Sequence, residues 1–297
     1  MSDDKAFGLP KVYACVNSDE KIRDRSSSGG VFFLLACYVL ENGGFVFGAG
    51  FDDNFNVVHK CVSNVDDLYD IMTSKYVQSS VKDAYSRVYE LLKEEKKVLF
   101  TGTPCQILGL NSYLSIKDGG KMRDDPNLLM MEIMCFGVPS PMVWRRYLDD
   151  LSKGRRIKNV SFRKKINGSG VKNLLIDFGD EQYISNYKDD KYYKAFSDAL
   201  SLRKSCYECD AKKSKRPSDI ILGDFWGIES INTKLDCEKG VSAVVVKTAK
   251  GLNAFENISD HLIYEEYGLG DVLKQNIYYK KSVPYNSGRS HFFEYYK

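Results

Sequence analysis

The chain has 297 residues, with 43 Lys+Arg against 40 Asp+Glu, a net charge of +3 and 43% hydrophobic residues. This composition is typical of globular proteins, and a net charge so close to zero excludes the strongly basic face on which dedicated nucleic-acid-binding proteins depend. The longest apolar run lies in GGVFFLLACYVL, at residues 29–40, and is far shorter than the roughly 20 residues that cross a bilayer. We therefore expect neither a nucleic acid partner nor a transmembrane segment.

Strand-like and helix-like segments alternate through the first half of the chain. Alternation of this kind predicts an α/β layer built on a largely parallel sheet. Strands are expected at residues 11–16, 45–52, 56–63, 97–102 and 128–135, and helices at 29–43, 80–97, from about 106, and 141–153.

The second half of the chain is richer in strands, which indicates an α+β layout. Three strands are expected in succession between residues 159 and 187, followed by a short helix near KYYKAFSDAL, strands at 219–226 and 242–248, and an amphipathic segment at 250–262. The charged stretch at 152–158 is the expected boundary between an α/β region, residues 1–154, and an α+β region, residues 155–297. The predicted fold class is thus α/β with an α+β second half and a mixed, largely parallel sheet.

Eight cysteines are the most informative feature of the composition. Residues 1–12 contain acidic side chains and no apolar stretch that leads to a small-residue cleavage site, so we expect no signal peptide and a cytoplasmic protein. Because the cytosol keeps thiols reduced, the cysteines are not expected to form disulfides. They lie at positions 15, 37, 61, 105, 135, 206, 209 and 237.

Four of the cysteines have an ordinary structural interpretation. Cys15, Cys37 and Cys61 lie in apolar segments. They are expected in the core, because a free cysteine packs as a small hydrophobic residue. Cys237 lies in a polar loop and has no evident partner.

Cys206 and Cys209 form a C-x-x-C pair in the polar segment RKSCYECDAKKSKRPSD. The pattern is shared by zinc knuckles, thioredoxin-like redox pairs and iron–sulfur half-sites. A thioredoxin-like pair opens a helix directly after a strand, whereas this pair follows a helical stretch, so a metal centre is favoured. The basic run KKSKR that follows is expected to be a solvated loop.

Cys105 and Cys135 each follow an apolar strand and precede a turn and a helix. Ligands bind at the carboxyl ends of strands in an open α/β sheet, and the start of a helix stabilises a thiolate. Four-thiolate zinc sites usually consist of two C-x-x-C knuckles, whereas iron–sulfur clusters also accept scattered thiolates. Cys105, Cys135, Cys206 and Cys209 therefore favour a 4Fe–4S cluster.

A turn rich in serine and glycine precedes the helix expected at 29–43. Ser26, Ser27 and Ser28 can cap that helix, and Gly29 and Gly30 allow backbone amides to approach a ligand. The turn is either an ordinary helix start or a phosphate-binding site.

Several strings together resemble one protein family. RSSSGG, GGFVFGAGFD, SKYVQS, VLFTGTPCQILGL, MCFGVPSP, FRKK, SCYEC and SDIILGDFWGI occur in this order within about residues 11–292. Their order and spacing resemble the coenzyme F420 hydrogenase/dehydrogenase beta-subunit family. That family includes the beta subunit of F420-dependent formate dehydrogenase, 7-hydroxymethyl chlorophyll a reductase and a divinyl chlorophyllide reductase.

The resemblance implies an iron–sulfur flavoprotein oxidoreductase with FAD and one 4Fe–4S cluster. Such a protein transfers electrons between a ferredoxin-like partner and an organic acceptor or a deazaflavin coenzyme. Lys75 would stabilise negative charge on the reduced flavin, and Asp224 would orient a cluster loop or exchange a proton. The matching residues are Cys105, Cys135, Cys206 and Cys209 as cluster ligands, and Ser27, Ser28, Gly29, Gly30, Ser74, Lys75, Tyr76 and Thr103 around the flavin.

Two other functions are compatible with the cysteines. A structural zinc site held by four thiolates would make the protein a non-catalytic binding module. A cysteine nucleophile at Cys105 would need a basic partner, and the chain offers only His59, His261 and His291, none of them in a recognisable partner motif.

Overall fold

The computed structural model describes residues 8–117, 119–166, 169–232 and 234–295. Residues 1–7, which carry part of the expectation that there is no signal peptide, lie outside this range. Within it, no helix is both long and apolar enough to span a bilayer.

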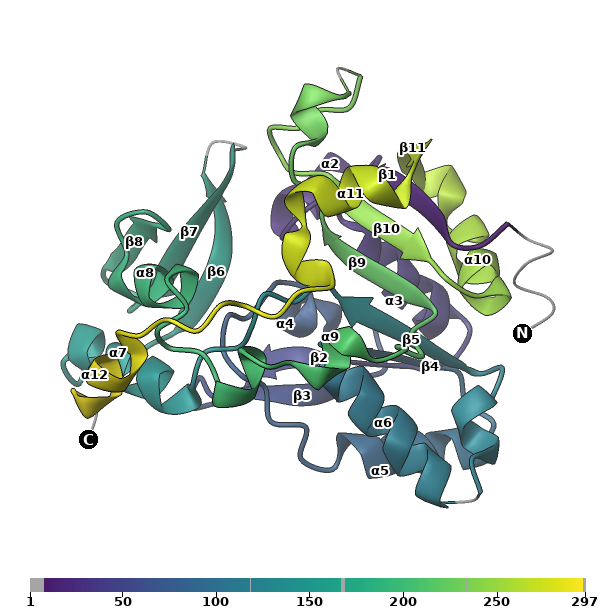
Figure 1. The fold of residues 1–297 in the computed structure, drawn as a ribbon, viewed down its shortest axis with the longest axis horizontal. Helices are drawn as coiled ribbons and strands as arrows, with labels where there is room; N and C mark the ends of the chain where they lie inside the picture. Colours follow the sequence, from purple (N-terminus) through teal and green to yellow (C-terminus); the bar gives the residue numbers. More distant parts are fainter. Residues whose placement is uncertain (1–7, 118, 167–168, 233, 296–297) are drawn as a thin grey trace.

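An eight-stranded mixed sheet forms the centre of the protein (Figure 1). Its strands lie in the order β11-β1-β10-β9-β5-β4-β2-β3. β2, β4, β5 and β9 run parallel, whereas the outer pairs are antiparallel. The predicted mixed sheet with a parallel centre is therefore confirmed. The strands are β1 (Lys11–Asn17), β2 (Phe45–Phe51), β3 (Val57–Val62), β4 (Val98–Gly102), β5 (Leu128–Ile133), β9 (Ile220–Asp224), β10 (Ser242–Val246) and β11 (Leu262–Tyr267).

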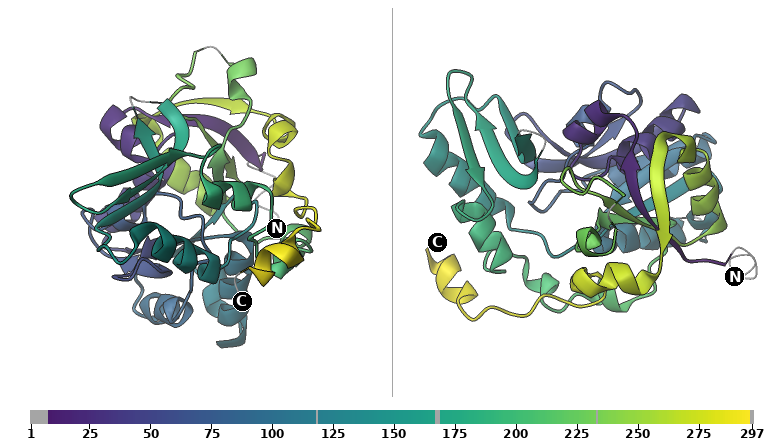
Figure 2. Two further views of the ribbon diagram at one scale, coloured as in Figure 1. Left: turned by 90° about the vertical axis from the view of Figure 1, so that its left-hand side faces the viewer. Right: turned by 90° about the horizontal axis from the view of Figure 1, so that it is seen from above.

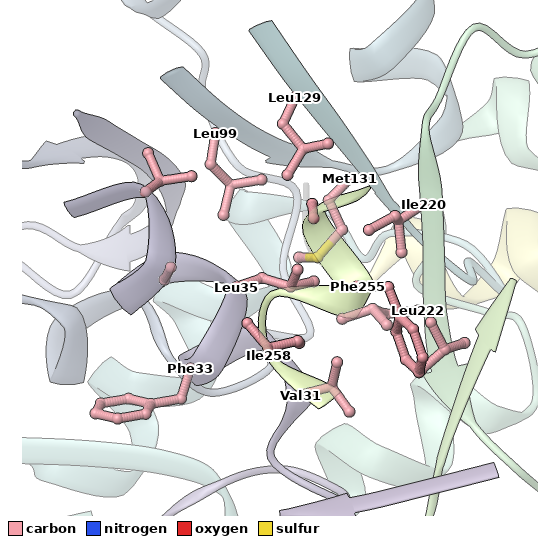
Figure 3. Packing of buried hydrophobic residues seen from close by; sticks show 14 of the residues in the cluster. Val31, Phe33, Leu35, Leu99, Leu129, Met131, Ile220, Leu222, Phe255 and Ile258 are labelled. Atoms are coloured by element: carbon pink, nitrogen blue, oxygen red, sulfur yellow. The ribbon is translucent and has the colours of Figure 1, made fainter. Parts of the chain in front are cut away.

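Helices cover both faces of the main sheet. α3 and α10 pack on the face that carries Leu99 and Met131 (Figure 3), and α5 and α6 pack on the face that carries Phe100 and Met130. Because side chains of a strand alternate between faces, neighbouring residues of β4 and β5 serve two separate cores. The helices are α2 (Glu20–Arg25), α3 (Val31–Glu41), α4 (Leu68–Ile71), α5 (Ala84–Lys93), α6 (Pro104–Lys117), α7 (Pro141–Ser152), α8 (Lys191–Ser197), α9 (Asp210–Lys213), α10 (Ala249–Glu256), α11 (Leu269–Gln275) and α12 (Arg289–Glu294), with short 3-10 turns η1 (Lys121–Asp124), η2 (Lys204–Cys206), η3 (Ile228–Ser230), η4 (Ser259–His261) and η5 (Ile277–Tyr279).

A second, antiparallel sheet lies to one side of the main sheet (Figures 1 and 2). It consists of β6 (Asn159–Ile166), β7 (Ser169–Asp177) and β8 (Gln182–Asn186), in that order, which confirms the three strands expected here. α7 and α8 pack against it through an aromatic core, in which the ring of Trp144 lies 4.8 Å from Phe162 and 5.0 Å from Tyr192.

The predicted boundary at residue 154 falls between α7 and the small sheet. After the small sheet the chain returns to the main sheet, where β9, β10 and β11 lie beside β5 and β1. Strands from both sides of the predicted boundary therefore share one sheet, and the division into two regions stays a prediction.

The three cysteines expected in the core have different environments. Cys15 is fully buried in β1, as expected, and Cys37 is partly buried against the same core. Cys61 is exposed on the edge strand β3, so its predicted burial is wrong. Cys61 pairs with Phe47 on the face that α5 covers, but β3 is the last strand of the sheet and has a neighbouring strand on one side only, which the local sequence does not reveal.

The basic run KKSKR is exposed in its middle, at residues 213–215, as its composition predicts, but its two ends are buried or partly buried. Lys212 is only 7% exposed, and Arg216 makes a buried ion pair of 2.5 Å with Glu132. Glu132 lies 84 positions away in the chain, so this pairing is a property of the tertiary structure.

Trp144 should be the main attachment of α7 to the rest of the aromatic core. Its side chain is fully buried, and its indole Nε1 donates to Phe55 O at 2.9 Å. The Trp144→Ala variant loses this bond and creates a cavity, so its free energy of unfolding should be about 3–5 kcal/mol lower in urea titrations. The Met142→Ala variant, at a half-exposed position of the same helix, should lose less than about 1 kcal/mol. Equal losses in the two variants would contradict this account.

Candidate functional site

The predicted site residues gather at one edge of the main sheet. β4, β5 and β9 run parallel and end at this edge, where Cys105 and Cys135 follow the first two strands and Asp224 closes the third. β1 is antiparallel to β10, and β10 is antiparallel to β9, so β1 ends at the same edge. There Asn17 N donates to Gly29 O at 2.7 Å. The serine–glycine turn and the strand-end residues therefore face a common region, as the topology rule for α/β sheets predicts.

Four thiols lie in one neighbourhood of this edge. Burial raises the pKa of the Cys135 thiol, and the thiols of Cys105, Cys206 and Cys209 raise it further, which places these three within electrostatic range of Cys135. Burial also raises the pKa of Cys206, and Cys105 and Cys209 add to that effect. The structure thus brings together the four predicted cluster ligands from three separate segments.

The side chains of the four cysteines, as they are oriented in this structure, do not form a metal site. Within the part of the chain that the structure describes, no group of three or more His, Cys, Asp or Glu side chains is arranged to hold a metal ion. Protonated thiols attract one another only weakly, and it is deprotonation and metal binding that draw thiolates together. The shared neighbourhood of the thiols is therefore the observation that bears on metal binding.

A buried lysine lies beside the four thiols. Lys212 Nζ donates to Phe136 O at 3.1 Å and to Lys281 O at 3.2 Å. Burial lowers the pKa of Lys212, and Cys135, Cys209 and Cys206 act against this. Among the described residues Lys212 has no carboxylate partner within ion-pair distance. A buried ammonium group is stable only beside compensating charge, and thiolates in a metal-bound state supply it, so the donor set fits a cluster held by these cysteines.

The GTPCQ string positions Cys105. Gln106 Oε1 accepts from Thr103 N at 3.0 Å and from Thr103 Oγ1 at 3.1 Å, which fixes the start of α6. Thr103 Oγ1 also lies 3.2 Å from Cys105 Sγ. Thr103, predicted to lie near the flavin, is thus found beside the thiols.

Arg163, in the FRKK string, connects the other predicted residues. Its guanidinium donates to Asp224 Oδ2 at 2.9 Å, to the hydroxyl of Tyr76 at 3.0 Å and to Ser27 O. Ser27 Oγ in turn accepts from Ser74 N at 2.8 Å. Ser27, Ser74, Tyr76 and Asp224 are therefore brought together around a residue to which the sequence analysis assigned no role. The only signal in the sequence that pointed to Arg163 was its place in FRKK, one of the strings that resemble the family.

Asp224 is held as a carboxylate by this arrangement. Burial alone would raise the pKa of Asp224, but the adjacent Arg163 guanidinium outweighs burial and holds the pKa below its usual range. The Arg163 and Asp224 side chains are 7% and 21% exposed. Because Asp224 stays ionised at neutral pH, its environment fits the predicted orienting role better than proton exchange.

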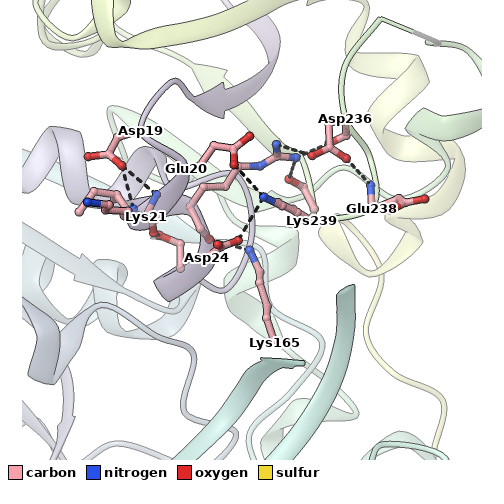
Figure 4. Close-up of polar contacts among 12 residues, drawn as sticks. Asp19, Glu20, Lys21, Asp24, Lys165, Asp236, Glu238 and Lys239 are labelled. Atoms are coloured by element: carbon pink, nitrogen blue, oxygen red, sulfur yellow. Dashed lines mark hydrogen bonds and ion pairs between the residues drawn. The ribbon is translucent and has the colours of Figure 1, made fainter. Parts of the chain in front are cut away.

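Lys165 brings a second cation to the serine–glycine turn. Its Nζ donates to Arg23 O at 2.6 Å and to Ser28 O at 3.4 Å. Burial, with the nearby charges of Arg23 and Arg163, lowers the pKa of Lys165 to about 8. Figure 4 shows Lys165 at the end of α2, where the loop before β10 supplies Lys239. These contacts fix the turn between α2 and α3.

Glycine is favoured at the two positions of the turn for different physical reasons. A Cβ at Gly29 would collide with Cys15 O, and the Gly29 amide already donates to Ser242 Oγ at 3.0 Å. Gly30 has φ 87°, a left-handed conformation that favours glycine, and it precedes α3 without a side-chain cap. Gly29 thus serves close packing, and the uncapped first turn of α3 is the part that can receive an anionic group.

Lys75 points to a different part of the edge. It lines a cavity of about 1100 Å³, together with the basic residues Lys60, Arg145 and Arg156. Its Nζ donates to Asp70 O at 2.8 Å, and burial lowers the pKa of Lys75 to about 7. The volume is sufficient for a large cofactor or substrate.

Aromatic rings separate the thiols from the Arg163 cluster. The ring of Tyr76 lies 5.1 Å from that of Phe196, which lies 5.3 Å from Phe136. Phe136 directly follows Cys135. The two halves of the site are thus adjacent, and a narrow apolar wall lies between them.

The cysteine-nucleophile alternative gains no support from the histidines. His59 is buried, stacks on Phe100 and has ring nitrogens 2.7 Å from Ser79 Oγ and 3.0 Å from Thr101 O. Both ring nitrogens of His59 are therefore already engaged by Ser79 and Thr101.

Family comparison supports the interpretation of this edge. The family model for the C-terminal part of the coenzyme F420 hydrogenase/dehydrogenase beta subunit matches residues 95–269, a span that contains Cys105, Cys135, the C-x-x-C pair and Asp224. The match covers more than half of the chain, and the chain therefore belongs to this family. It is a redox protein of the F420 hydrogenase beta-subunit type.

A solved structure has a similar fold. It is a chain of the xenon-derivatised F420-reducing NiFe hydrogenase complex from Methanosarcina barkeri, with 16% sequence identity and a TM-score of 0.57. The similarity covers 90% of this chain and 88% of that chain. No curated protein matches the sequence.

The ion pair between Arg163 and Asp224 generates a prediction about pH. The Asp224→Asn variant leaves Arg163 buried without its charge partner, so its free energy of unfolding at pH 7 should be about 3 kcal/mol lower. Because the pKa of Asp224 is lowered in the folded state, this stabilisation is present above the ordinary carboxyl pKa of about 4 and is lost as the pH falls through the lower folded value. Urea titrations at neutral and acidic pH should therefore show the difference between wild type and variant shrinking in acid.

The exposed pair of Arg123 and Asp124 is the matched control, with side chains 44% and 76% exposed. The Asp124→Asn variant should change stability little at either pH, because solvent screens an exposed pair. A difference for Asp224→Asn that stays constant from neutral to acidic pH would refute the assigned ion pair.

Proposed function

We propose that the protein is an iron–sulfur flavoprotein oxidoreductase that contains FAD and one 4Fe–4S cluster. It transfers electrons between a ferredoxin-like partner and an organic acceptor or a deazaflavin coenzyme. The observation that carries the proposal is the meeting of four cysteines from three segments beside the buried Lys212, at the edge where the Arg163 cluster also lies. Membership of the F420 hydrogenase/dehydrogenase beta-subunit family supports it.

The residues proposed to hold the cluster are Cys105, Cys135, Cys206 and Cys209. Their positions at a helix start, a strand end and a short loop leave the sulfur atoms free to rotate toward a common centre. Lys212 then offsets part of the negative charge of the four thiolates. Thr103 Oγ1, already 3.2 Å from Cys105 Sγ, can donate a hydrogen bond to that thiolate.

The flavin is proposed to lie between the serine–glycine turn and the small sheet. The uncapped start of α3 would receive a phosphate, and Arg163 would keep Ser27 and Tyr76 in fixed positions. The flavin ring would extend toward the cavity that Lys75 lines, where the lysine would stabilise negative charge on the reduced ring. A flavin exchanges a hydride or two single electrons and a cluster exchanges one electron at a time, so together they supply two-electron to one-electron conversion.

The apolar wall of Phe136 and Phe196 has a role in this arrangement. Its rings would lower the local dielectric between the two cofactors, which would strengthen the interaction of Lys212 with the thiolates. The wall therefore keeps the two halves close and chemically separate.

Protein prepared without oxygen should contain about four iron atoms and one FAD per chain. Metal analysis, flavin fluorescence after denaturation and the visible absorption spectrum measure this. One zinc ion, with no iron and no flavin, would contradict the proposal and support a structural four-cysteine site.

The Cys→Ser variants at positions 105, 135, 206 and 209 identify the ligands. Each should lose iron and melt at a lower temperature, because metal binding and folding are coupled. Cys61→Ala and Cys37→Ala are the matched controls and should keep their iron. Iron retained in the Cys206 or Cys209 variant, with iron lost in a control, would refute the ligand set.

A further inference from the structure

A hollow with both apolar and polar lining residues lies beside Phe136, the residue that follows Cys135. It has a volume of about 370 Å³, and its apolar side is formed by Phe136, Tyr278, Val283, Pro284 and Tyr285. Phe136 follows Cys135 in the chain, and the Tyr285 side chain is 58% exposed. The hollow therefore reaches from the solvent to the residue next to a proposed cluster ligand.

Exposed basic side chains lie on the segments that carry or contact the thiols. We call them the basic rim: Arg203, Lys204, Lys213, Lys215, Lys280 and Lys281. The exposed acidic residues of the same segments are Asp198, Glu208 and Asp210. Within the described residues the only ion pair of the rim is a loose one, Lys213 with Asp210 at 4.0 Å. Six basic and three acidic residues leave a surplus of three charges, which equals the net charge of the whole chain, +3.

Backbone contacts hold the rim against the thiols. Cys206 N donates to Arg203 O at 2.9 Å, and Cys209 N donates to Ser282 Oγ at 2.8 Å. Lys212 Nζ donates to Lys281 O at 3.2 Å. The segments that carry the rim are therefore the segments that carry or contact the thiols, so a protein docked on the rim lies next to them.

We propose that the hollow and the basic rim form the docking surface for a small electron-transfer protein with a negatively charged face. The inference rests on the proposed function, because the partner must reach the cluster. A small hollow with a charged border is suited to weak and rapid complexes, in which opposite charges speed association and orient the partner. Because most cations of the basic rim have no ion-pair partner among the described residues, they can pair with acidic side chains of a docked protein.

Other occupants fit less well. A second copy of the chain in a symmetric dimer would place two basic rims against each other, which costs free energy. Nucleic acid would need a wider basic surface than a patch whose surplus is three charges.

Binding of a ferredoxin with net negative charge tests the proposal. Isothermal titration calorimetry with the holoprotein should show a dissociation constant that rises at least about tenfold between low salt and about 0.5 M NaCl. The Lys280→Glu/Lys281→Glu and Lys213→Glu/Lys215→Glu variants should each bind about tenfold more weakly at low salt. Iron content and melting temperature of the variants should match those of wild type, which shows that they fold.

The matched control is Lys93→Glu/Lys96→Glu. Both lysines are exposed; Lys93 ends α5 and Lys96 lies between α5 and the start of β4, at the edge of the sheet opposite the thiols. This variant has the same change in net charge as each rim variant, so it should bind the ferredoxin within about twofold of wild type, because its charges lie beyond the screening length of the docking surface.

The other possible results either overturn the docking surface or separate it from the proposed function. Equal affinity of the rim variants and wild type, equal losses in rim and control variants, or no binding at low salt would overturn the docking surface. Binding of a short DNA duplex as tight as that of the ferredoxin, or a salt-sensitive dimer abolished by the rim variants, would also overturn it. If the preparation binds ferredoxin through the rim but contains no iron or flavin, the proposed function fails and the docking surface stands.

Discussion

The candidate site depends on one buried cation, Arg163. Its guanidinium reaches from the small sheet to Asp224 at the end of β9, and it also contacts Tyr76 and Ser27. Removing a cation of this kind from water is costly unless its donors and its charge are satisfied, and here three segments satisfy it together. The position of the small sheet over the strand ends is therefore coupled to the positions of the serine–glycine turn and of Tyr76, so a ligand that binds one of them meets the others already in place.

The thiol half of the site is organised by the same principle. Lys212 is buried with carbonyl partners from two segments, and its charge acts on Cys135, Cys206 and Cys209. Each half thus has a buried cation, beside the carboxylate of Asp224 in one half and beside thiols that become negative on metal binding in the other. Ring contacts of Phe136, Phe196 and Tyr76 connect these two charged environments.

Much of this arrangement was predictable because the carboxyl ends of parallel strands meet at one edge of a sheet. Cys105 and Cys135 were predicted to lie at the same edge because each follows an apolar strand, and the sheet confirms that placement. The main helices and strands were also predictable, because apolar residues recur along each of them with the period of its own secondary structure. Arg163, Lys165 and Lys212 were not predictable as site residues, because nothing in a local string distinguishes a buried, paired cation from a solvated one. Thr103 and Lys75 illustrate the same limit, since one lies beside the thiols and the other lines the cavity.

The amino-acid sequence by itself determined the class of fold, the four cysteines that can act together and the family to which the chain belongs. These follow from patterns within short segments: alternation of apolar residues, the end of a strand, the spacing of two cysteines and the strings around them. Only the tertiary structure decided which polar side chains are buried and with what partners. Arg216 and Glu132 are 84 positions apart, and Arg163 and Asp224 are 61 apart. The free energy of a buried charge depends on the atoms that replace its water, and those atoms come from segments that the chain brings together only on folding.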